Sequence, residues 1–244
     1  MDRMIYVAMS GASQVMLKQA SNSHNLANAN TTGFKAEIDN FQSKPVYGPG
    51  FPDRVYGVDH RTGVDQSSGS IMQTGNPLDI AINGEGFIAV QAADGSEAYT
   101  RAGNLRVSEL GMLETAGGDP VLGDGGPITL SPYEEILIGA DGTVTIKPLG
   151  QSAGELAVLD RIKLVNPDPS TITRNKEGLF TTPNESEVAD ASVTLSTESL
   201  ESSNVNSVQA LVTMIELSRQ FETQVKLMKA AEDADTAAGT LLKN

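Results

Sequence analysis

The chain has 244 residues, with 17 basic and 31 acidic side chains, a net charge of −14 and no cysteine. Nucleic acid and anionic membrane surfaces are poor partners for so acidic a chain, because a phosphate-rich surface needs a basic face opposite it. The lack of cysteine excludes disulfides and thiolate chemistry.

The N-terminal segment carries a helical pattern. Its apolar and small side chains recur at alternating steps of three and four residues, the spacing of a heptad seam: Ile5, Ala8, Ala12, Val15, Gln19, Asn22, Leu26 and Ala29. These side chains are small or polar, so an isolated helix would be marginal in water. The residues expected to satisfy backbone groups where this helix ends are Asn25, Asn28, Asn30 and Gly33.

Neither a signal peptide nor a membrane span is evident. Residues 4–11 form too short an apolar run for a secretory signal and lack a convincing cleavage site. No segment approaches the roughly 20 apolar residues that a span requires. We therefore expect no membrane insertion, and either retention in the cytoplasm or export by a route that reads no cleavable signal.

The middle of the chain differs in composition from both ends. All eleven prolines fall between Pro45 and Pro183. Residues 44–69, rich in proline and glycine, predict an extended loop or linker. From residue 70 onward, apolar residues recur at every second position, as in 78–82, 87–90 and 143–146. Turn-forming pairs such as Asn83-Gly84 separate these strand-like segments. Residues 70–203 therefore predict an antiparallel β domain, sandwich or barrel-like, with a hairpin at Asn83-Gly84.

The C-terminal segment again predicts a helix, opening at Ser203-Asn204-Val205-Asn206. Asn204 and Asn206 are the expected helix-start residues. One apolar stripe is expected over about 35 residues, a rod of roughly 50 Å: Val208, Leu211, Ile215, Phe221, Val225, Met228, Ala231, Ala238 and Leu241. A helix lying on its own domain would show such a stripe. The absence of proline in both terminal segments, and the turn-rich stretches that separate them from the middle, favour a coiled coil between the termini.

These patterns define an α+β fold. N- and C-terminal helices form a coiled-coil-like domain that flanks an inserted, mostly antiparallel β domain. The expected boundaries are 1–43 and 204–244 for the terminal helical assembly domain, 44–69 for the linker and 70–203 for the β-rich outer domain.

The sequence contains no recognisable catalytic or metal site. His24 and His60 are the only histidines, and neither has an acidic neighbour at a metal-ligand spacing. Asp119, Asp124 and Asp141 lie among glycines, but none matches an EF-hand loop, and turn-forming aspartate explains them. No nucleophile is paired with a base. We predict no catalytic residues, no metal and no cofactor.

Motifs along nearly the whole chain resemble those of the bacterial flagellar rod and hook family. They comprise Asn25-Leu26-Ala27-Asn28, Thr32-Gly33-Phe34-Lys35, residues 74–82, Tyr99-Thr100-Arg101-Ala102-Gly103, Ser203-Asn204-Val205-Asn206 and Arg219-Gln220-Phe221-Glu222. The opening residues 1–12 and the compact length are most similar to the proximal rod proteins of that family. The segment 104–111 departs from the pattern, because relatives commonly carry an aromatic followed by an aspartate there.

The resemblance implies a structural subunit of the flagellar basal-body rod, the drive shaft linking motor to hook. Such a subunit is exported by the flagellar type III apparatus without cleavage and lies in the rod that crosses the periplasm. It assembles helically with other rod proteins and with copies of itself. A distal rod or hook-type relative is the nearest alternative, and a surface or secreted enzyme is the alternative of a different class.

In this interpretation the terminal helices stay labile in the monomer and become ordered when neighbours cover their seams. The expected subunit-interface residues are Ile5, Ala8, Ala12, Val15, Leu26, Phe34, Val208, Leu211, Ile215, Phe221, Val225 and Met228. The small side chains among them would allow close helix packing.

Overall fold

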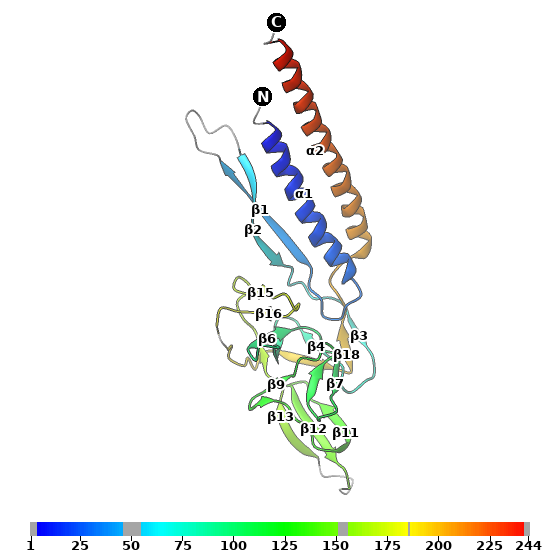
Figure 1. The fold of residues 1–244 in the computed structure, drawn as a ribbon. Coiled ribbons are helices and arrows are strands. Elements are labelled where there is room, and N and C mark those ends of the chain that lie inside the picture. Colours follow the sequence, from blue (N-terminus) through cyan, green and yellow to red (C-terminus); the bar gives the residue numbers. More distant parts are fainter. Residues whose placement is uncertain (1–3, 46–54, 151–155, 185, 242–244) are drawn as a thin grey trace. The chain divides into compact units, whose positions relative to one another are not determined.

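The computed structural model describes residues 4–45, 55–150, 156–184 and 186–241. Helix α1 (Met4–Ala27) lies at one end of the chain, helix α2 (Ser207–Leu241) lies at the other, and strands fill the middle (Figure 1). All paired strands are antiparallel. The expected α+β class with a central antiparallel β region is therefore confirmed.

The chain forms two compact units. The helical unit comprises residues 1–29, 37–65 and 205–244, and the β unit comprises residues 30–36 and 66–204. These units differ from the boundaries expected from the sequence at two points. Residues 30–36, expected with the terminal helices, belong to the β unit, and much of the expected linker belongs to the helical unit.

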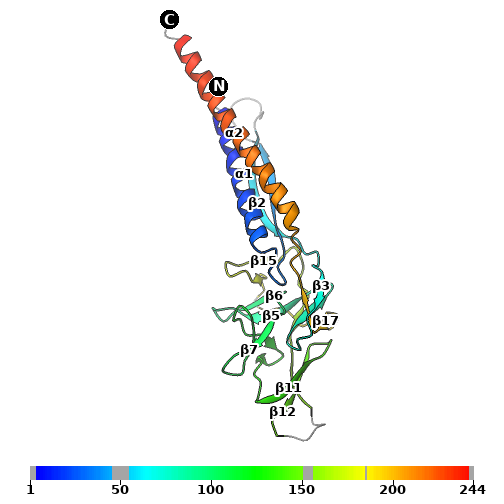
Figure 2. The same ribbon diagram turned by 90° about the vertical axis from the view of Figure 1, so that its right-hand side faces the viewer.

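In the helical unit, α1 and α2 run antiparallel and side by side, as Figures 1 and 2 show from two directions. A hairpin of β1 (Glu37–Pro45) and β2 (Val55–Val64) completes the unit, with an irregularity in register after Asn40. Strand β2 lies where we expected an extended loop. The prolines behind that expectation do not interrupt the strands, because Pro45 ends β1 and Pro49 and Pro52 lie outside the described residues.

The β unit consists of short strands in several small sheets. The largest sheet has the order β14-β5-β6-β16-β15, and a second has the order β11-β12-β13. Two-stranded pairs are β3–β18, β4–β17, β7–β8 and β9–β10. The strands are β3 (Ile71–Gln73), β4 (Ile80–Asn83), β5 (Phe87–Gln91), β6 (Glu97–Thr100), β7 (Leu105–Val107), β8 (Leu113–Thr115), β9 (Leu122–Gly123), β10 (Gly126–Pro127), β11 (Tyr133–Ile138), β12 (Thr143–Pro148), β13 (Ala157–Arg161), β14 (Leu164–Val165), β15 (Thr173–Arg174), β16 (Phe180–Thr181), β17 (Thr194–Thr197) and β18 (Ser199–Glu201).

One hydrophobic core joins these sheets. Its buried members are aliphatic and include Ile80, Ile88, Leu113, Ile146 and Leu195. Because strands of both main sheets contribute to the same cluster, the β unit is a single packed body and not a chain of separate hairpins.

The first strands of the β unit pair with its last strands. Strand β3 pairs with β18, and β4 pairs with β17. The chain therefore enters and leaves this unit along neighbouring strands.

The hairpin expected at Asn83-Gly84 is wrong, because β4 and β5 lie in different sheets. Gly84 and Gly86 both have positive φ, 83° and 126°, and redirect the chain between the sheets. A Cβ at Gly86 would meet Val193 at 2.8 Å, so the turn is also closely packed.

Candidate assembly surface

Helices α1 and α2 cover one face of each other. On α1 the buried side chains are Ala8, Ala12 and Val15, on the heptad spacing read from the sequence, with Ile5, Gln19, Asn22 and Leu26 half-buried. On α2 the same spacing links buried Ala210, Leu217 and Ala231 with half-buried Met214, Phe221, Gln224 and Met228. The seam of each helix is thus at least partly covered within one chain.

A glycine and an asparagine at the contact between α1 and α2 influence how closely the helices pack and in which register. A Cβ at Gly11 would lie 3.2 Å from the Gln224 side chain, so glycine allows a close approach there. Asn22 donates its amide Nδ2–H to the carbonyl of Ala210 over 2.8 Å. A polar residue in such a seam favours one register over others.

The single stripe expected on the C-terminal helix is wrong, because its members fall on two faces. Ala231 is buried and Phe221 and Met228 are half-buried, whereas Val208, Leu211 and Ile215 are exposed. The buried face also includes Ala210 and Leu217, which the predicted stripe left out. The spacing of apolar residues does not show which of two apolar helix faces is buried, because residues three and four positions apart share a face on either side of the helix.

The exposed apolar side chains form what we call the outer stripes. They follow helical spacing and are between 45% and 69% exposed: Tyr6, Met9 and Met16 on α1, and Val208, Leu211, Val212 and Ile215 on α2. Exposed apolar side chains that share one helix face, unlike scattered ones, are typical of an interaction surface.

The other predicted interface residues occupy mixed positions. Val225 is exposed, and Phe221 and Met228 are half-buried. Phe34 lies outside the helical unit: its ring stacks on the Arg174 guanidinium, 4.5 Å from the centroid, and Phe180 lies 4.9 Å from the same guanidinium. Within this chain, Phe34 therefore serves to dock residues 30–36 in the β unit.

The predicted helix-end residues adopt several roles. The Asn206 side chain accepts hydrogen bonds from the backbone N–H groups of Val208 and Gln209, at 3.0 and 3.1 Å, and so caps α2. Asn25 exchanges two hydrogen bonds with the backbone of Glu37, at 2.8 and 2.9 Å, and joins the end of α1 to β1.

The other predicted helix-end residues form hydrogen bonds or are exposed. Asn28 donates its side-chain amide to the His24 carbonyl over 2.9 Å, and Asn30 is exposed. Asn204 accepts from the backbone N–H of Ala36 over 2.7 Å, within the β unit.

A buried ion cluster holds residues 30–36 in the β unit. The Lys35 ammonium lies 2.7 Å from one carboxylate oxygen of Glu201, and the Arg101 guanidinium lies 3.0 Å from the other. All three side chains are at most 3% exposed. Gly33 approaches so closely that a Cβ there would stand 2.2 Å from the Arg101 carbonyl. The sequence alone does not predict this cluster, because nothing local links three charges so far apart in the chain.

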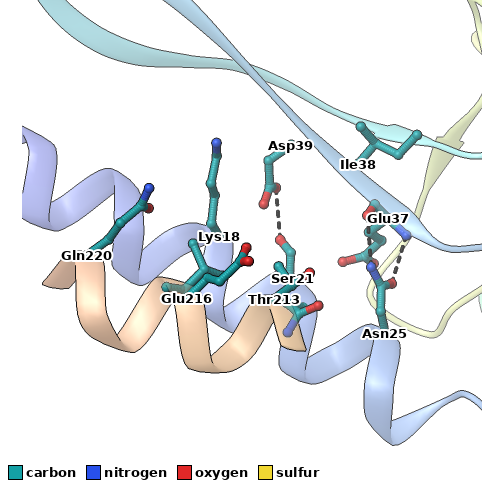
Figure 3. Close-up of a pocket in the computed structure, with 11 residues that line it drawn as sticks. Lys18, Ser21, Asn25, Glu37, Ile38, Asp39, Thr213, Glu216 and Gln220 are labelled. Atoms are coloured by element: carbon teal, nitrogen blue, oxygen red, sulfur yellow. Dashed lines mark hydrogen bonds between the residues drawn. The ribbon is translucent and has the colours of Figure 1, made fainter. Parts of the chain in front are cut away.

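A groove of about 370 Å³ opens in the helical unit between α1, β1 and α2 (Figure 3). We call it the acidic groove, because its lining contains three carboxylates and one ammonium: Lys18, Ser21, Asn22, Asn25, Glu37, Ile38, Asp39, Thr213, Glu216, Leu217 and Gln220. Ser21 donates to Asp39 over 2.8 Å, and His24 lies 3.2 Å from Glu37.

A polar network around Glu97 fastens the loop before β17. The Lys163 ammonium lies 2.8 and 2.9 Å from the two carboxylate oxygens, and Ser186 and Tyr99 also donate to them. Burial by itself would raise the pKa of Glu97, but these hydrogen bonds outweigh it and lower the pKa. Burial and the Glu97 carboxylate raise the pKa of Tyr99.

The described ranges contain no group of three or more His, Asp or Glu side chains placed to hold a metal ion. Within those ranges, too, neither helix combines the length and hydropathy that a membrane span demands. Among the described residues, the outer stripes and the acidic groove both suit protein contacts.

Sequence models of three protein families match separate parts of the chain. "Flagella basal body rod protein" matches residues 5–35, "Flagellar hook protein FlgE/F/G D1 domain" matches 81–146, and "Flagellar basal body rod FlgEFG protein C-terminal" matches 196–241. Each matched segment supplies one member of the buried ion cluster, namely Lys35, Arg101 and Glu201.

Whole-chain relatives agree with these matches. The flagellar basal-body rod proteins FlgF of Salmonella typhimurium and Escherichia coli K12 are each 39% identical to this chain, and the match covers 99% of either sequence. The flagellar basal-body rod protein FlgG of Bacillus subtilis is 29% identical, over 95% of this chain and 96% of its own length. The chain therefore belongs to the FlgF family of flagellar basal-body rod proteins.

Proposed function

We propose that this chain is a structural, non-catalytic subunit of the proximal part of the flagellar basal-body rod. It assembles helically with other rod subunits and with copies of itself, and it reaches the rod through the flagellar export apparatus without cleavage. The proximal position rests on the identity of 39% with the FlgF proteins of Salmonella typhimurium and Escherichia coli K12, against 29% with FlgG of Bacillus subtilis.

The observation that carries this proposal is the pair of outer stripes. Met16 on α1 and Ile215 on α2 are 59% and 56% exposed, although each sits on a helix whose other face is already covered. Burial of such a side chain in a subunit contact stabilises the assembly, by about 1.5–3 kcal/mol for a side chain that goes from fully exposed to fully buried. A chain with two uncovered apolar faces is suited to contact neighbours on more than one side.

The predicted interface residues of α1 and α2 fall into two groups, those at least partly buried between the two helices and those exposed on their outer faces. Ala8, Ala12 and Val15 allow α1 and α2 to approach closely, in a pairing that we propose has coiled-coil geometry. Val208, Leu211, Ile215 and Val225 face outward and meet neighbouring subunits. The helical unit is then the assembly domain, and the β unit is the outer domain of the subunit.

The proposal is tested by deleting the gene in its flagellated host and restoring either the native sequence or variants. Ile215→Asp and Met16→Asp should abolish swimming and remove the chain from isolated basal bodies, because a charge would be buried in a subunit contact. Gln209→Asp adds the same charge at an exposed polar position of α2 that lies roughly 100° round the helix from Val208, so it is the matched control and should swim normally. Normal rods from both stripe variants, or normal swimming without the gene, would refute the proposed function.

A distal rod or hook-type role is the second candidate, favoured by the match to the FlgG relative. The same deletion strain separates the two. Loss of a proximal subunit leaves basal bodies without the rest of the rod, whereas loss of a distal subunit leaves a short proximal rod in place.

A further inference from the structure

The described residues that line the acidic groove carry a net negative charge. Among them, Lys18 is the cationic side chain, against the carboxylates of Glu37, Asp39 and Glu216. Figure 3 shows the three carboxylates drawn from two different elements, β1 and α2, around the same hollow. Glu216 forms no hydrogen bond or ion pair with any described residue, so one carboxylate on the α2 side remains available.

The chain carries a segment of complementary chemistry farther along α2. Lys226 and Lys229, three positions apart, lie on adjoining helix positions and are exposed. No ion pair joins either ammonium to another described residue. Val225, four positions before Lys229 and therefore on the same helix face, is 42% exposed, so this face presents an apolar contact together with positive charge. The groove likewise combines Ile38 and Leu217 with its carboxylates.

These lysines cannot reach the groove of their own chain. They follow Glu216 by ten and thirteen residues on a continuous helix, which places them about 15–20 Å farther along its axis at 1.5 Å per residue. A lysine side chain is much shorter than that separation. Only a second molecule can bring such a segment into the groove.

We propose that the acidic groove of one subunit receives the Lys226–Lys229 segment of a second copy of this chain. The inference rests on the proposed rod function and names one contact within it. Each subunit carries both patches, so two copies could pair reciprocally and close as a dimer, but in a rod the contact repeats head-to-tail from subunit to subunit. A head-to-tail contact that does not close produces a helical array. Charge complementarity fixes the register of such a contact more than it adds to affinity.

Cysteine cross-linking gives a direct test, because the native chain contains no cysteine. Two differently tagged copies, one Glu216→Cys and one Lys229→Cys, are expressed together in the deletion host. Basal bodies are isolated and treated with a mild oxidant, and disulfide-linked heterodimers are measured on gels. We expect them at least tenfold above the pair Glu216→Cys with Glu109→Cys, whose second position is an exposed site in the β unit.

Charge exchange provides the second arm. Glu216→Lys and Lys229→Glu alone should each lower incorporation into basal bodies at least tenfold, and the double exchange should restore it. Glu109→Lys carries the same charge change outside the groove and should have no effect. Native swimming without cross-linking or rescue would overturn the groove contact alone. Cross-links from Glu216→Cys to a different rod protein would also overturn the second-copy assignment, whereas absence of the chain from native basal bodies would overturn the rod function itself.

Discussion

Lys35 and Glu201 are 166 residues apart in the sequence, yet the Lys35 ammonium lies 2.7 Å from the Glu201 carboxylate inside the β unit. Lys35 also donates to the Ser67 carbonyl over 2.9 Å, and Glu201 also accepts from the backbone N–H of Gly69 over 2.8 Å. The segment that follows α1 and the strand that precedes α2 are therefore held by one buried carboxylate.

Glu201→Gln should destabilise the β unit strongly, by about 3–5 kcal/mol, because it leaves two buried cations without their anion. Lys35→Met should cost less, about 1–3 kcal/mol, since Glu201 keeps Arg101 and the Gly69 N–H. Urea unfolding of the full chain followed by circular dichroism measures both. Equal losses from the two variants would contradict the central position of Glu201 in the cluster.

Gly33→Ala should release residues 30–36 from the β unit. Gly33 has a φ of 67°, and its Cβ would clash with the Arg101 backbone at 2.2 Å. Gly95→Ala is the matched control, because Gly95 has a φ of 84° with open space around it. We expect about 1 kcal/mol for the control from backbone strain alone and a clearly larger loss at Gly33. Hydrogen exchange at 30–36 should accelerate only in Gly33→Ala.

Ala12→Leu should loosen the pairing of α1 with α2, because Ala12 is only 6% exposed and leucine would add three carbons at this buried position. Overpacking of this kind costs about 1–3 kcal/mol. The β unit should remain folded and incorporation into the rod should fail. Ser13→Leu, one position away on the exposed side, should leave helix exchange rates unchanged. A native rod built from Ala12→Leu would argue against close packing in this seam.

Because of the Glu97 network, the free energy of unfolding should decrease at acidic pH. The pKa of Glu97 is lowered in the folded chain from an ordinary value of 4.5. The unfolded chain therefore binds the proton first as the pH falls, and the stabilisation is present above pH 4.5 and is lost below it. Stability measured from pH 6 to pH 3 should fall more steeply for the native chain than for Glu97→Gln. Parallel curves for the two proteins would contradict this role.

The sequence predicted those features that depend on neighbouring residues. The heptad spacing at Ala8, Ala12 and Val15 predicted the buried face of α1, and the period of two predicted antiparallel strands in the middle. Pairings between distant segments were out of reach. Strand β4 pairs with β17, more than 100 residues away, and not with its sequence neighbour β5, and no local pattern at Asn83-Gly84 distinguishes a hairpin from a turn that leads into another sheet.

The candidate surface was predicted less completely than the fold. Apolar residues at steps of three and four identify a helix, but they do not tell which of two apolar faces a partner helix will cover. Leu217 and Ile215 are equally apolar, and only the antiparallel contact with α1 makes the first buried and the second exposed. Lys35, Arg101 and Glu201 left no local signal, since lysine, arginine and glutamate are usually solvated.

The pairing of β3 with β18 means that the two ends of the β unit meet side by side. A different insert could replace residues between these strands while the flanking helices keep their sequence, provided that its own ends are equally close. Related subunits can therefore differ in the length of the segment between β3 and β18 while both terminal helices keep their sequence. The same pair of strands is a suitable site at which to insert a foreign domain between the helices.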